Sequence, residues 1–138
     1  MITYATGSIF DSSAQTLACL VNTVGVMGAG LALAFKRRYP KLLPAYRDAC
    51  NNGLLRPGVP WVWHEVLCFP TKRDWRDSSD IGDISQGLAW IERNQHRFAS
   101  LALPALGCGL GGLAWADVRE YIERYLSDSE LPVFVFSP

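Results

Sequence analysis

Short apolar runs alternate along the chain with segments in which apolar residues recur every three or four positions. Runs rich in Val, Leu, Ile and aromatic side chains are typical of buried strands. Six strands are expected, at residues 2–5, 17–22, 59–64, 66–69, 100–103 and 133–136. The segments between them have the period of amphipathic helices. This alternation predicts an α/β fold, in which helices cover a sheet.

Two sets of residues have the spacing of one helical face: Ile81, Ile84, Leu88 and Ile91, and Trp115, Val118, Ile122 and Leu126. Each set gives a helix one apolar side that can pack on the sheet. Two further helices are expected at residues 28–38 and 42–51. Pro40 ends the first of these, because the residue before a proline disfavours the α conformation.

Two glycine-dense stretches each follow a predicted strand and lead toward a predicted helix. They are VNTVGVMGAGLALAFKRR at residues 21–38 and LPALGCGLGGLAW at residues 103–115. Glycine lets the backbone approach an anion, and the first amides of a helix point at it with the positive end of the helix dipole. Glycines can also serve only to shape tight turns. Two such loops, with CFPTKRDWR at residues 68–76 between them, favour a cleft that binds a diphosphate.

Length and composition narrow the class of protein. The 138 residues, 49% of them hydrophobic, are enough for a substantial core, so we expect a single domain over residues 1–138. Thirteen basic and thirteen acidic residues leave no net charge, so any contact with DNA must be local. The four cysteines form no CxxC pair, the two histidines offer no metal-ligand spacing, and no apolar segment has membrane length. We expect a reduced, cytoplasmic monomer with no metal and no membrane association.

Several segments together resemble a known family. The start ITYATGSIF, the two glycine stretches and the FPTK block at residues 69–72 are similar, in this order, to those of macrodomains. The resemblance covers nearly the whole chain and is strongest to the branch that contains DarG, the DNA ADP-ribosyl glycohydrolase antitoxin, and the terminal ADP-ribose protein glycohydrolase. It implies an α/β three-layer sandwich, a mixed six-stranded sheet flanked by helices, with ADP-ribose in a cleft at the strand ends.

The resemblance also implies which residues contact the ligand. The two glycine stretches would clasp the diphosphate and the distal ribose. Amides of residues 107–110 can bond phosphate oxygens, and Asn22 offers an amide to a ribose hydroxyl or to an attached base. The implied ligand contacts are Ser8, Ile9, Asn22, Thr23, Gly25, Val26, Met27, Gly28, Ala29, Gly30, Leu106, Gly107, Cys108, Gly109, Leu110, Gly111 and Gly112.

Lys72 is the residue for which we predict a catalytic role. In the DarG-like branch the lysine of the FPTK block is catalytic, and the same block stands here at residues 69–72. A primary amine can attack the anomeric carbon of the distal ribose once the sugar ring opens, or it can stabilise the departing group as a cation. A lone lysine in a polar loop would ordinarily be a solvated surface residue. Its place after an apolar strand, inside the matching block, favours the catalytic role.

The residues that follow Lys72 are candidates for contacts with the acceptor or with DNA: Arg73, Asp74, Trp75 and Arg76. An exposed tryptophan flanked by arginines can stack on a base while the guanidinium groups meet phosphates. Trp75 could equally be a loop anchor that packs on the domain. Cys108 is expected to be a small buried loop residue and not a nucleophile, because nothing places a histidine beside it.

The chain departs from the wider family at three positions. Ser8 follows Gly7 where macrodomains commonly have an aspartate that bonds the adenine amino group, so looser adenine selectivity is expected. Gly111 stands where the protein-directed glycohydrolase has an acidic residue that completes the lysine chemistry. Asp74 replaces a histidine that is usual in the DarG-like block, and its carboxylate would either substitute for the missing acid or weaken DNA contact.

The sequence therefore predicts a macrodomain that removes ADP-ribose from an ADP-ribosylated DNA base and needs no cofactor. The partner implied by the resemblance is a DarT-type ADP-ribosyltransferase toxin. Two alternatives stay open: a hydrolase of ADP-ribose esters on Asp or Glu of proteins, and a non-catalytic ADP-ribose reader. The lysine block favours an enzyme, because a reader has no need of it.

Overall fold

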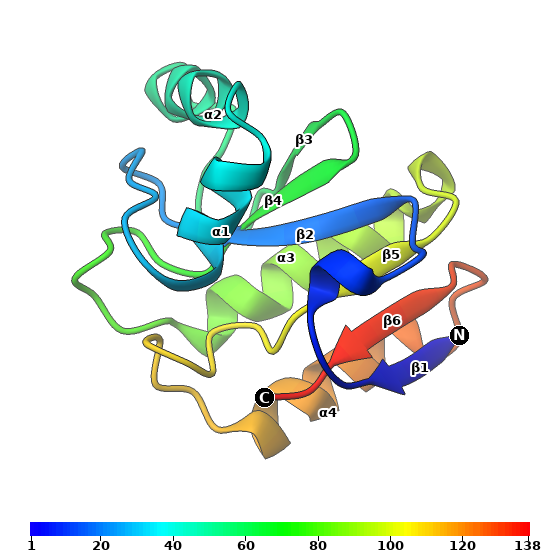
Figure 1. Ribbon diagram of the computed structural model, residues 1–138. Coiled ribbons are helices and arrows are strands. Elements are labelled where there is room, and N and C mark those ends of the chain that lie inside the picture. The colour runs from blue at the N-terminus through cyan, green and yellow to red at the C-terminus, as the bar shows by residue number, and fades with distance from the viewer.

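The computed structural model describes all 138 residues and contains one six-stranded sheet (Figure 1). The strands are β1 (Ile2–Ala5), β2 (Thr16–Val21), β3 (Trp61–Trp63), β4 (Val66–Pro70), β5 (Leu101–Leu103) and β6 (Val133–Phe136). Their order across the sheet is β1-β6-β5-β2-β4-β3. Neighbouring strands are parallel except β3 and β4, which are antiparallel. The sheet is therefore mixed, as the resemblance implied.

Helices cover both faces of the sheet. They are α1 (Gly30–Arg38), α2 (Leu42–Asn51), α3 (Ile81–Arg93) and α4 (Trp115–Leu126), with short 3-10 turns at Ile9–Asp11 and Gln95–Arg97. The apolar faces of α3 and α4 share one hydrophobic core, whereas α1 and α2 share the other. This arrangement gives the three layers that were predicted. None of the helices is long and apolar enough to cross a membrane.

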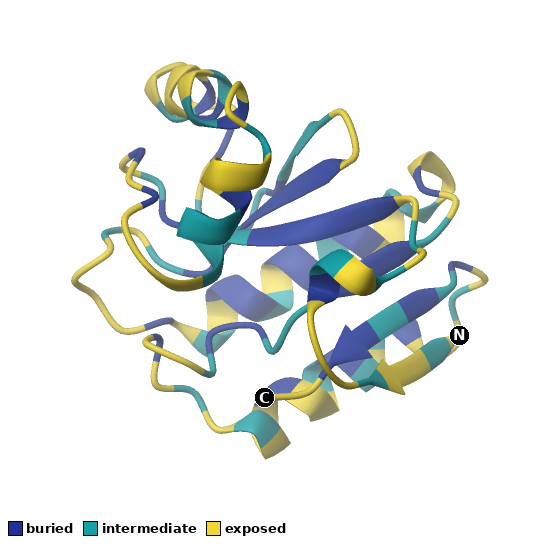
Figure 2. Ribbon diagram, viewed as in Figure 1, coloured by how far each residue is buried: buried dark blue, intermediate teal, exposed yellow.

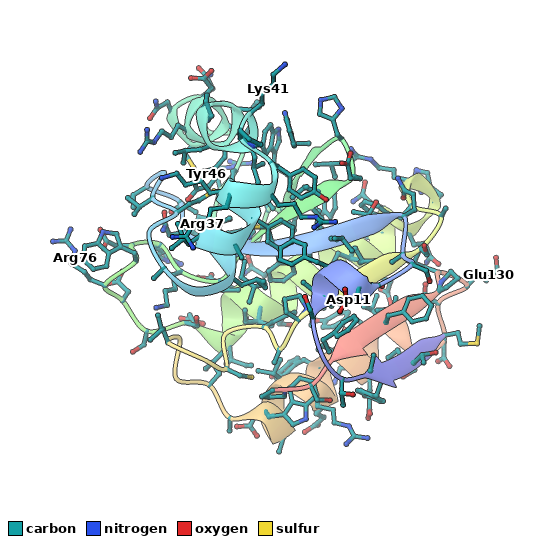
Figure 3. The ribbon with its side chains drawn as sticks, in the orientation of Figure 1. Asp11, Arg37, Lys41, Tyr46, Arg76 and Glu130 are labelled. Carbon is teal, nitrogen blue, oxygen red and sulfur yellow. The ribbon has the colours of Figure 1, made fainter.

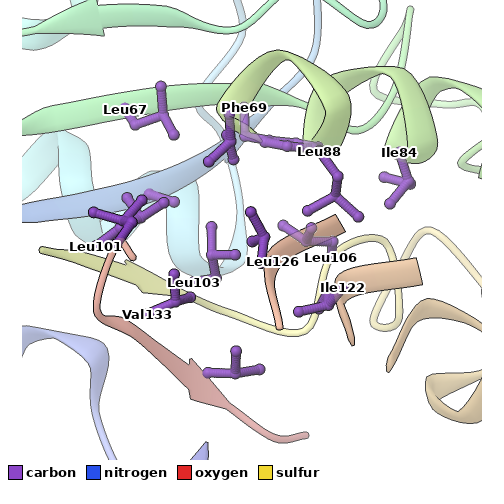
Figure 4. Close-up of a cluster of buried hydrophobic side chains, with 14 of the residues drawn as sticks. Leu67, Phe69, Ile84, Leu88, Leu101, Leu103, Leu106, Ile122, Leu126 and Val133 are labelled. Carbon is purple, nitrogen blue, oxygen red and sulfur yellow. The ribbon is translucent and has the colours of Figure 1, made fainter. Parts of the chain in front are cut away.

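The alternation of side chains along the strands builds both cores at once. Ala18 of β2 and Leu67 and Phe69 of β4 join the core under α3 and α4, while Cys19 and Cys68 face α1 and α2. Figure 4 shows Leu67 and Phe69 packed with residues of α3, α4 and β5. Figure 2 shows the central strands as the most buried part of the molecule. The near-continuous apolar runs in the sequence reflect this burial on both faces.

Some predicted bounds differ from the observed ones. The strand expected at residues 59–64 is limited to Trp61–Trp63, because Val59 donates to the carbonyl of Arg56 and Pro60 has no amide to donate. Helix α1 begins at Gly30 and not at residue 28, since Ala29 is extended. Residues 104–114 separate β5 from α4, so the second glycine stretch makes its turn from strand to helix through a long loop.

The carboxyl ends of β2, β4 and β5 lie at the same edge of the sheet, because these strands are parallel. Three segments leave that edge: the first loop (residues 22–29), the Lys72 segment (residues 71–80) and the late loop (residues 104–114). Figure 1 shows all three on the same side of the molecule. Segments far apart in sequence thus meet around one site, as is typical of open α/β sheets.

Candidate functional site

The three segments enclose a cleft of about 600 Å³. The first loop and the start of α1 form one wall, the late loop forms another, and Lys72 and Trp75 lie between them. The residues that line the cleft are Leu20, Val21, Asn22, Val26, Gly28, Ala29, Gly30, Leu31, Ala32, Thr71, Lys72, Trp75, Gly107, Gly109, Leu110 and Gly111. Lys72 is the only charged side chain among them. The cleft is therefore apolar and glycine-lined, with a single cation.

The N-terminus of α1 opens into the cleft without a side-chain cap. Ala29 at the N-cap has no side chain that could accept from the helix amides, and the first turn contains no acidic residue. The amides of Gly28 and Ala29 donate no hydrogen bond within the protein. The first residues of α1, Gly30, Leu31 and Ala32, line the cleft, so the unpaired first amides of the helix and the positive end of its dipole face the cleft. This wall is suited to bind an anion.

The late loop offers a second group of free amides. Contacts from Leu113 to the carbonyl of Gly107 (3.0 Å) and from Gly112 to that of Gly109 (3.1 Å) close the loop on itself. The amides of Gly109, Leu110 and Gly111 donate no hydrogen bond within the protein, and all three residues line the cleft. A row of free amides of this kind is a nest for phosphate oxygens.

The run of free amides differs from the predicted one. The sequence pointed to residues 107–110, but the Cys108 amide donates to the carbonyl of Ala105 at 3.2 Å. The amide of Cys108 is therefore occupied, and the cleft-lining run ends one residue later, at Gly111. Cys108 itself is half-buried, and burial raises the pKa of its thiol. That pKa favours the unreactive thiol over a nucleophilic thiolate.

Gly111 has no room for a side chain. A Cβ at this position would overlap the hydroxyl of Ser79 and lie 2.5 Å from the carbonyl oxygen of Gly107. Ser79 is buried, its amide donates to the carbonyl of Gly111 at 3.0 Å, and its hydroxyl has no hydrogen-bond partner. This contact joins the Lys72 segment to the late loop. In this conformation position 111 cannot hold an acidic residue.

Asn22 shapes the first loop with its side chain. Its Oδ1 accepts from the amides of Val24, Gly25 and Val26 at 3.1 to 3.3 Å, and its Nδ2 donates to the carbonyl of Val26 at 2.8 Å. The loop is thereby wound around one side chain. Asn22 also lines the cleft, but one hydrogen of its amide is already used inside the loop.

Tyr46 of α2 holds Asn22, and with it the first loop, in place. Its hydroxyl donates to both the carbonyl and Oδ1 of Asn22, each at 2.7 Å, and the side chain is fully buried. Figure 3 shows Tyr46 between α2 and the first loop. Burial raises the pKa of Tyr46, so the hydroxyl keeps its proton. No sequence pattern marked this role, because Tyr46 fits the apolar face of α2.

We expect Tyr46→Phe to lower the free energy of unfolding by about 1–3 kcal/mol, because buried acceptors on Asn22 lose their donor. Chemical denaturation of the variant and the wild type measures this difference. Tyr39→Phe is the matched control, since the Tyr39 hydroxyl makes no hydrogen bond within the protein. Equal losses in the two variants would contradict a specific role for the Tyr46 hydroxyl.

Lys72 has no acidic partner. Its Nζ contacts only the backbone carbonyl of Trp75, at 3.4 Å, and no carboxylate lies within ion-pair distance. The neighbouring cations differ: Arg73 pairs with Asp83 at 3.3 Å, and Arg76 pairs with Asp74 at 3.0 Å. The cation of the cleft is thus unpaired and accessible, whereas its neighbours on the segment are neutralised.

Asp74 is held away from a catalytic role. Its carboxylate accepts from the backbone amide of Arg76 (2.9 Å) and from its guanidinium (3.0 and 3.2 Å). The side-chain hydrogen bonds from Arg76 hold the pKa of Asp74 below its usual range, so the carboxyl carries no proton to donate. Asp74 does not line the cleft. Its arrangement does not support the suggestion that it substitutes for the acid missing at Gly111.

Several predicted contacts lie outside the cleft. These residues are Ser8, Ile9, Thr23, Gly25, Met27, Leu106, Cys108, Gly112, Arg73, Asp74 and Arg76. Ile9, Met27 and Leu106 are buried in the core, and Ser8 caps the 3-10 turn by accepting from Phe10. Thr23 donates to the carbonyl of Arg73 through its amide (3.1 Å) and its hydroxyl (2.9 Å). Thr23 thereby joins the first loop to the Lys72 segment.

Other cleft residues were missed by the sequence analysis: Leu20, Val21, Leu31, Ala32 and Thr71. Leu20 and Val21 end β2, Thr71 directly follows β4, and Leu31 and Ala32 lie in the first turn of α1. Their position at the carboxyl ends of parallel strands was the available signal. Nowhere do three or more His, Cys, Asp or Glu side chains gather in a way that could hold a metal ion.

Comparison with known proteins identifies the family to which this fold and cleft belong. The Macro domain family matches residues 20–122, most of the chain. The chain belongs to the macro domain family. This macro domain is 40% identical, over 96% of its length, to a DNA ADP-ribosyl transferase-DNA ADP-ribosyl glycohydrolase fusion protein of Thermosipho africanus. It spans only 40% of that relative, so the fusion protein contains much more than the part compared.

Solved structures place the whole chain in this fold. Thermosipho africanus DarTG in complex with ADP-ribose is 41% identical, with a TM-score of 0.95 over 99% of this chain and 41% of that one. The macrodomain of Thermus aquaticus DarG is 36% identical, with a TM-score of 0.94 over 100% of this chain and 99% of that one. The fold that the sequence resemblance implied is confirmed by these neighbours.

Proposed function

We propose that this macro domain binds ADP-ribose in the cleft and releases it from an ADP-ribosylated DNA base. The proposal rests mainly on one observation. The unpaired Lys72 is the only charged side chain in a cleft whose two walls present free backbone amides. Two sets of amides suit the two phosphates of a diphosphate. The names of its relatives support the choice of ligand and reaction, since DarTG of Thermosipho africanus was solved with ADP-ribose and the related fusion protein is called a DNA ADP-ribosyl glycohydrolase.

The diphosphate would lie between the start of α1 and the late loop. The amides of Gly28 and Ala29 would bond one phosphate, and those of Gly109, Leu110 and Gly111 the other. Apolar residues of the strand ends line the cleft beside these amides, and apolar surroundings strengthen hydrogen bonds. Thr23 would act by fixing the first loop against the Lys72 segment.

Lys72 would act on the bond between the distal ribose and the acceptor. With no carboxylate beside it, the amine is free to attack the anomeric carbon of the opened sugar, or, as a cation, to stabilise the departing group. Its contact with the Trp75 carbonyl holds it at the cleft. The first route needs the amine neutral and the second needs it charged.

Removal of ADP-ribose from protein carboxyl groups is the weaker candidate. The protein-directed glycohydrolases that this chain resembles have an acidic residue at the position of Gly111. Here Gly111 is packed against Ser79 and Gly107, and there is no room for a side chain. A reader without turnover would bind through the amides alone, and Lys72 would then have no function. As partner we propose a DarT-type ADP-ribosyltransferase, whose modification the macro domain would reverse.

Free ADP-ribose is expected to bind and to raise the melting temperature. A ligand bound only by the folded state adds about 2.7 kcal/mol of stability at a concentration 100 times its Kd. Calorimetric titration and thermal unfolding measure both effects. The absence of any interaction at millimolar ADP-ribose would refute the proposed ligand. AMP alone is the control, and it should bind more weakly, because it lacks the second phosphate and the distal ribose.

The acceptor is tested by turnover. ADP-ribosylated DNA and glutamate-linked ADP-ribosyl protein are incubated separately with the macro domain, and released ADP-ribose is measured. We expect release from DNA at a rate well above that from protein. Release from protein alone would favour the ester hydrolase, and binding without release from either substrate would favour the reader.

A further inference from the structure

Exposed apolar side chains gather around the mouth of the cleft. Val24 and Val26 of the first loop, Trp75 of the Lys72 segment and Leu110 of the late loop are all exposed. Trp75 is 53% and Leu110 81% accessible, and both line the cleft together with Val26. Exposed apolar residues scattered singly need no explanation, but a group around an opening marks a binding surface. The three loops contribute to one apolar rim.

The indole of Trp75 is contacted by Arg76 at this rim. The guanidinium of Arg76 lies 5.1 Å from the ring centroid, and Asp74 binds that guanidinium through both carboxylate oxygens. The turn is closed by the Asp77 amide, which donates to the Asp74 carbonyl at 3.0 Å. Figure 3 shows Arg76 at the outer end of this segment, away from the body of the protein. A ring held before binding loses little conformational freedom on contact with a ligand.

Trp75 also lies close to the reacting group. Its backbone carbonyl is 3.4 Å from Nζ of Lys72, so the rest of the residue is near any group attached to the sugar carbon that Lys72 serves. That attached group is the acceptor, which leaves ADP-ribose at the mouth of the cleft. The acceptor must therefore pass along the rim that Trp75 and Leu110 form.

We propose that Trp75 and Leu110 form a subsite for the acceptor base, in which an unpaired nucleobase stacks on the indole and contacts the leucine. The inference rests on the proposed function and names the residues that bind the acceptor. A planar apolar face suits a base, since every base has a π-face. An acidic peptide would need free cations beside Lys72, but Arg73 and Arg76 are each paired with an aspartate. Arg73 and Asp74 thus support the subsite without joining it.

The test compares affinity for an ADP-ribosylated single-stranded oligonucleotide with affinity for free ADP-ribose. It is made in a Lys72→Ala background, so that the substrate is not consumed. We expect the oligonucleotide to bind more tightly than ADP-ribose, and Trp75→Ala to reduce this advantage by about 5- to 100-fold, the range for a stacked base. Affinity for ADP-ribose should change by less than about twofold, since the walls that hold the diphosphate are untouched.

Matched variants separate stacking from loss of structure. Trp75→Phe keeps an aromatic face at residue 75 and should retain most of the affinity advantage of the oligonucleotide over ADP-ribose. Leu110→Ala should reduce the preference for the oligonucleotide over ADP-ribose. Leu54 is an exposed leucine that does not line the cleft, so Leu54→Ala should leave this preference unchanged.

The outcomes distinguish this inference from the proposed function. If the Trp75→Ala variant still binds the ADP-ribosylated oligonucleotide more tightly than ADP-ribose by the original factor, the subsite proposal is wrong, even if the wild type releases ADP-ribose from DNA. An equal loss of affinity for ADP-ribose and for the oligonucleotide would also overturn it, because Trp75 would then belong to the ADP-ribose site. Failure of the wild type to release ADP-ribose from DNA would refute the proposed reaction, while the binding comparison would still decide on the subsite.

Discussion

Lys72→Ala is expected to slow the release of ADP-ribose from DNA by at least ~100-fold while affinity for ADP-ribose changes little. Lys72 is the only charged side chain in the cleft, and no carboxylate pairs with it. An amine that acts mainly in the transition state adds little to ground-state affinity, so rate and binding should separate. Single-turnover release of ADP-ribose and calorimetric titration measure the two effects on the same variant.

Lys41→Ala is the matched control, because Lys41 is an exposed lysine at the start of α2 and does not line the cleft. It should keep the wild-type rate. Reduction with borohydride during turnover then distinguishes the two chemical roles, since only a Schiff base gives a stable adduct at Lys72. Wild-type turnover by Lys72→Ala would disprove the assignment, and a substrate-assisted water would be the next candidate.

The sequence was sufficient to predict most of the fold. Helix α2 has the predicted bounds, and β1 and β6 are also as predicted, because apolar periodicity and proline or glycine boundaries are local signals. That the sheet is mixed came instead from the resemblance to a family, and the order of the strands and the antiparallel β3 came only from the structure. Periodicity identifies a strand but does not say which strand lies beside it.

The sequence predicted which segments form the candidate site, but not the contacts that hold these segments in place. The glycine stretches and the lysine block pointed to the three segments that meet, since a free anion-binding loop needs glycine. The supporting contacts were hidden: Tyr46 to Asn22, Ser79 to Gly111 and Thr23 to Arg73. Each joins residues distant in sequence and of ordinary type, so no local pattern marks it.

Gly109 and Gly111 show that the sequence alone does not tell why a glycine is needed at a position. Both are glycines of the late loop, both line the cleft, and both have free amides. A Cβ at Gly111 would overlap Ser79, whereas a Cβ at Gly109 would have nothing within 4 Å. Gly111 is therefore required by packing inside the protein, and Gly109 can be required only by what enters the cleft. Sequence cannot separate these two reasons.

This difference makes Gly109 the position at which to block the cleft without harming the fold. Gly109→Glu should remove detectable binding of ADP-ribose while the melting temperature of the unliganded protein stays near that of the wild type. The new side chain starts in open space, at a backbone conformation that is not left-handed, and extends where the phosphates would lie. Its carboxylate adds a like charge beside the diphosphate, and such a juxtaposition costs several kcal/mol.

A short series at Gly109 separates size from charge. Gly109→Ala adds only a methyl group in open space and should keep most of the affinity, while Gly109→Gln fills the same volume as glutamate without its charge. We expect affinity to fall in the order Ala, Gln, Glu, with the step from Gln to Glu shrinking at high salt, because screening weakens the repulsion. Calorimetric titration of the folded variants measures the series. Wild-type affinity in a folded Gly109→Glu protein would place the diphosphate away from the late loop, and the free amides of Gly109, Leu110 and Gly111 would then need another ligand.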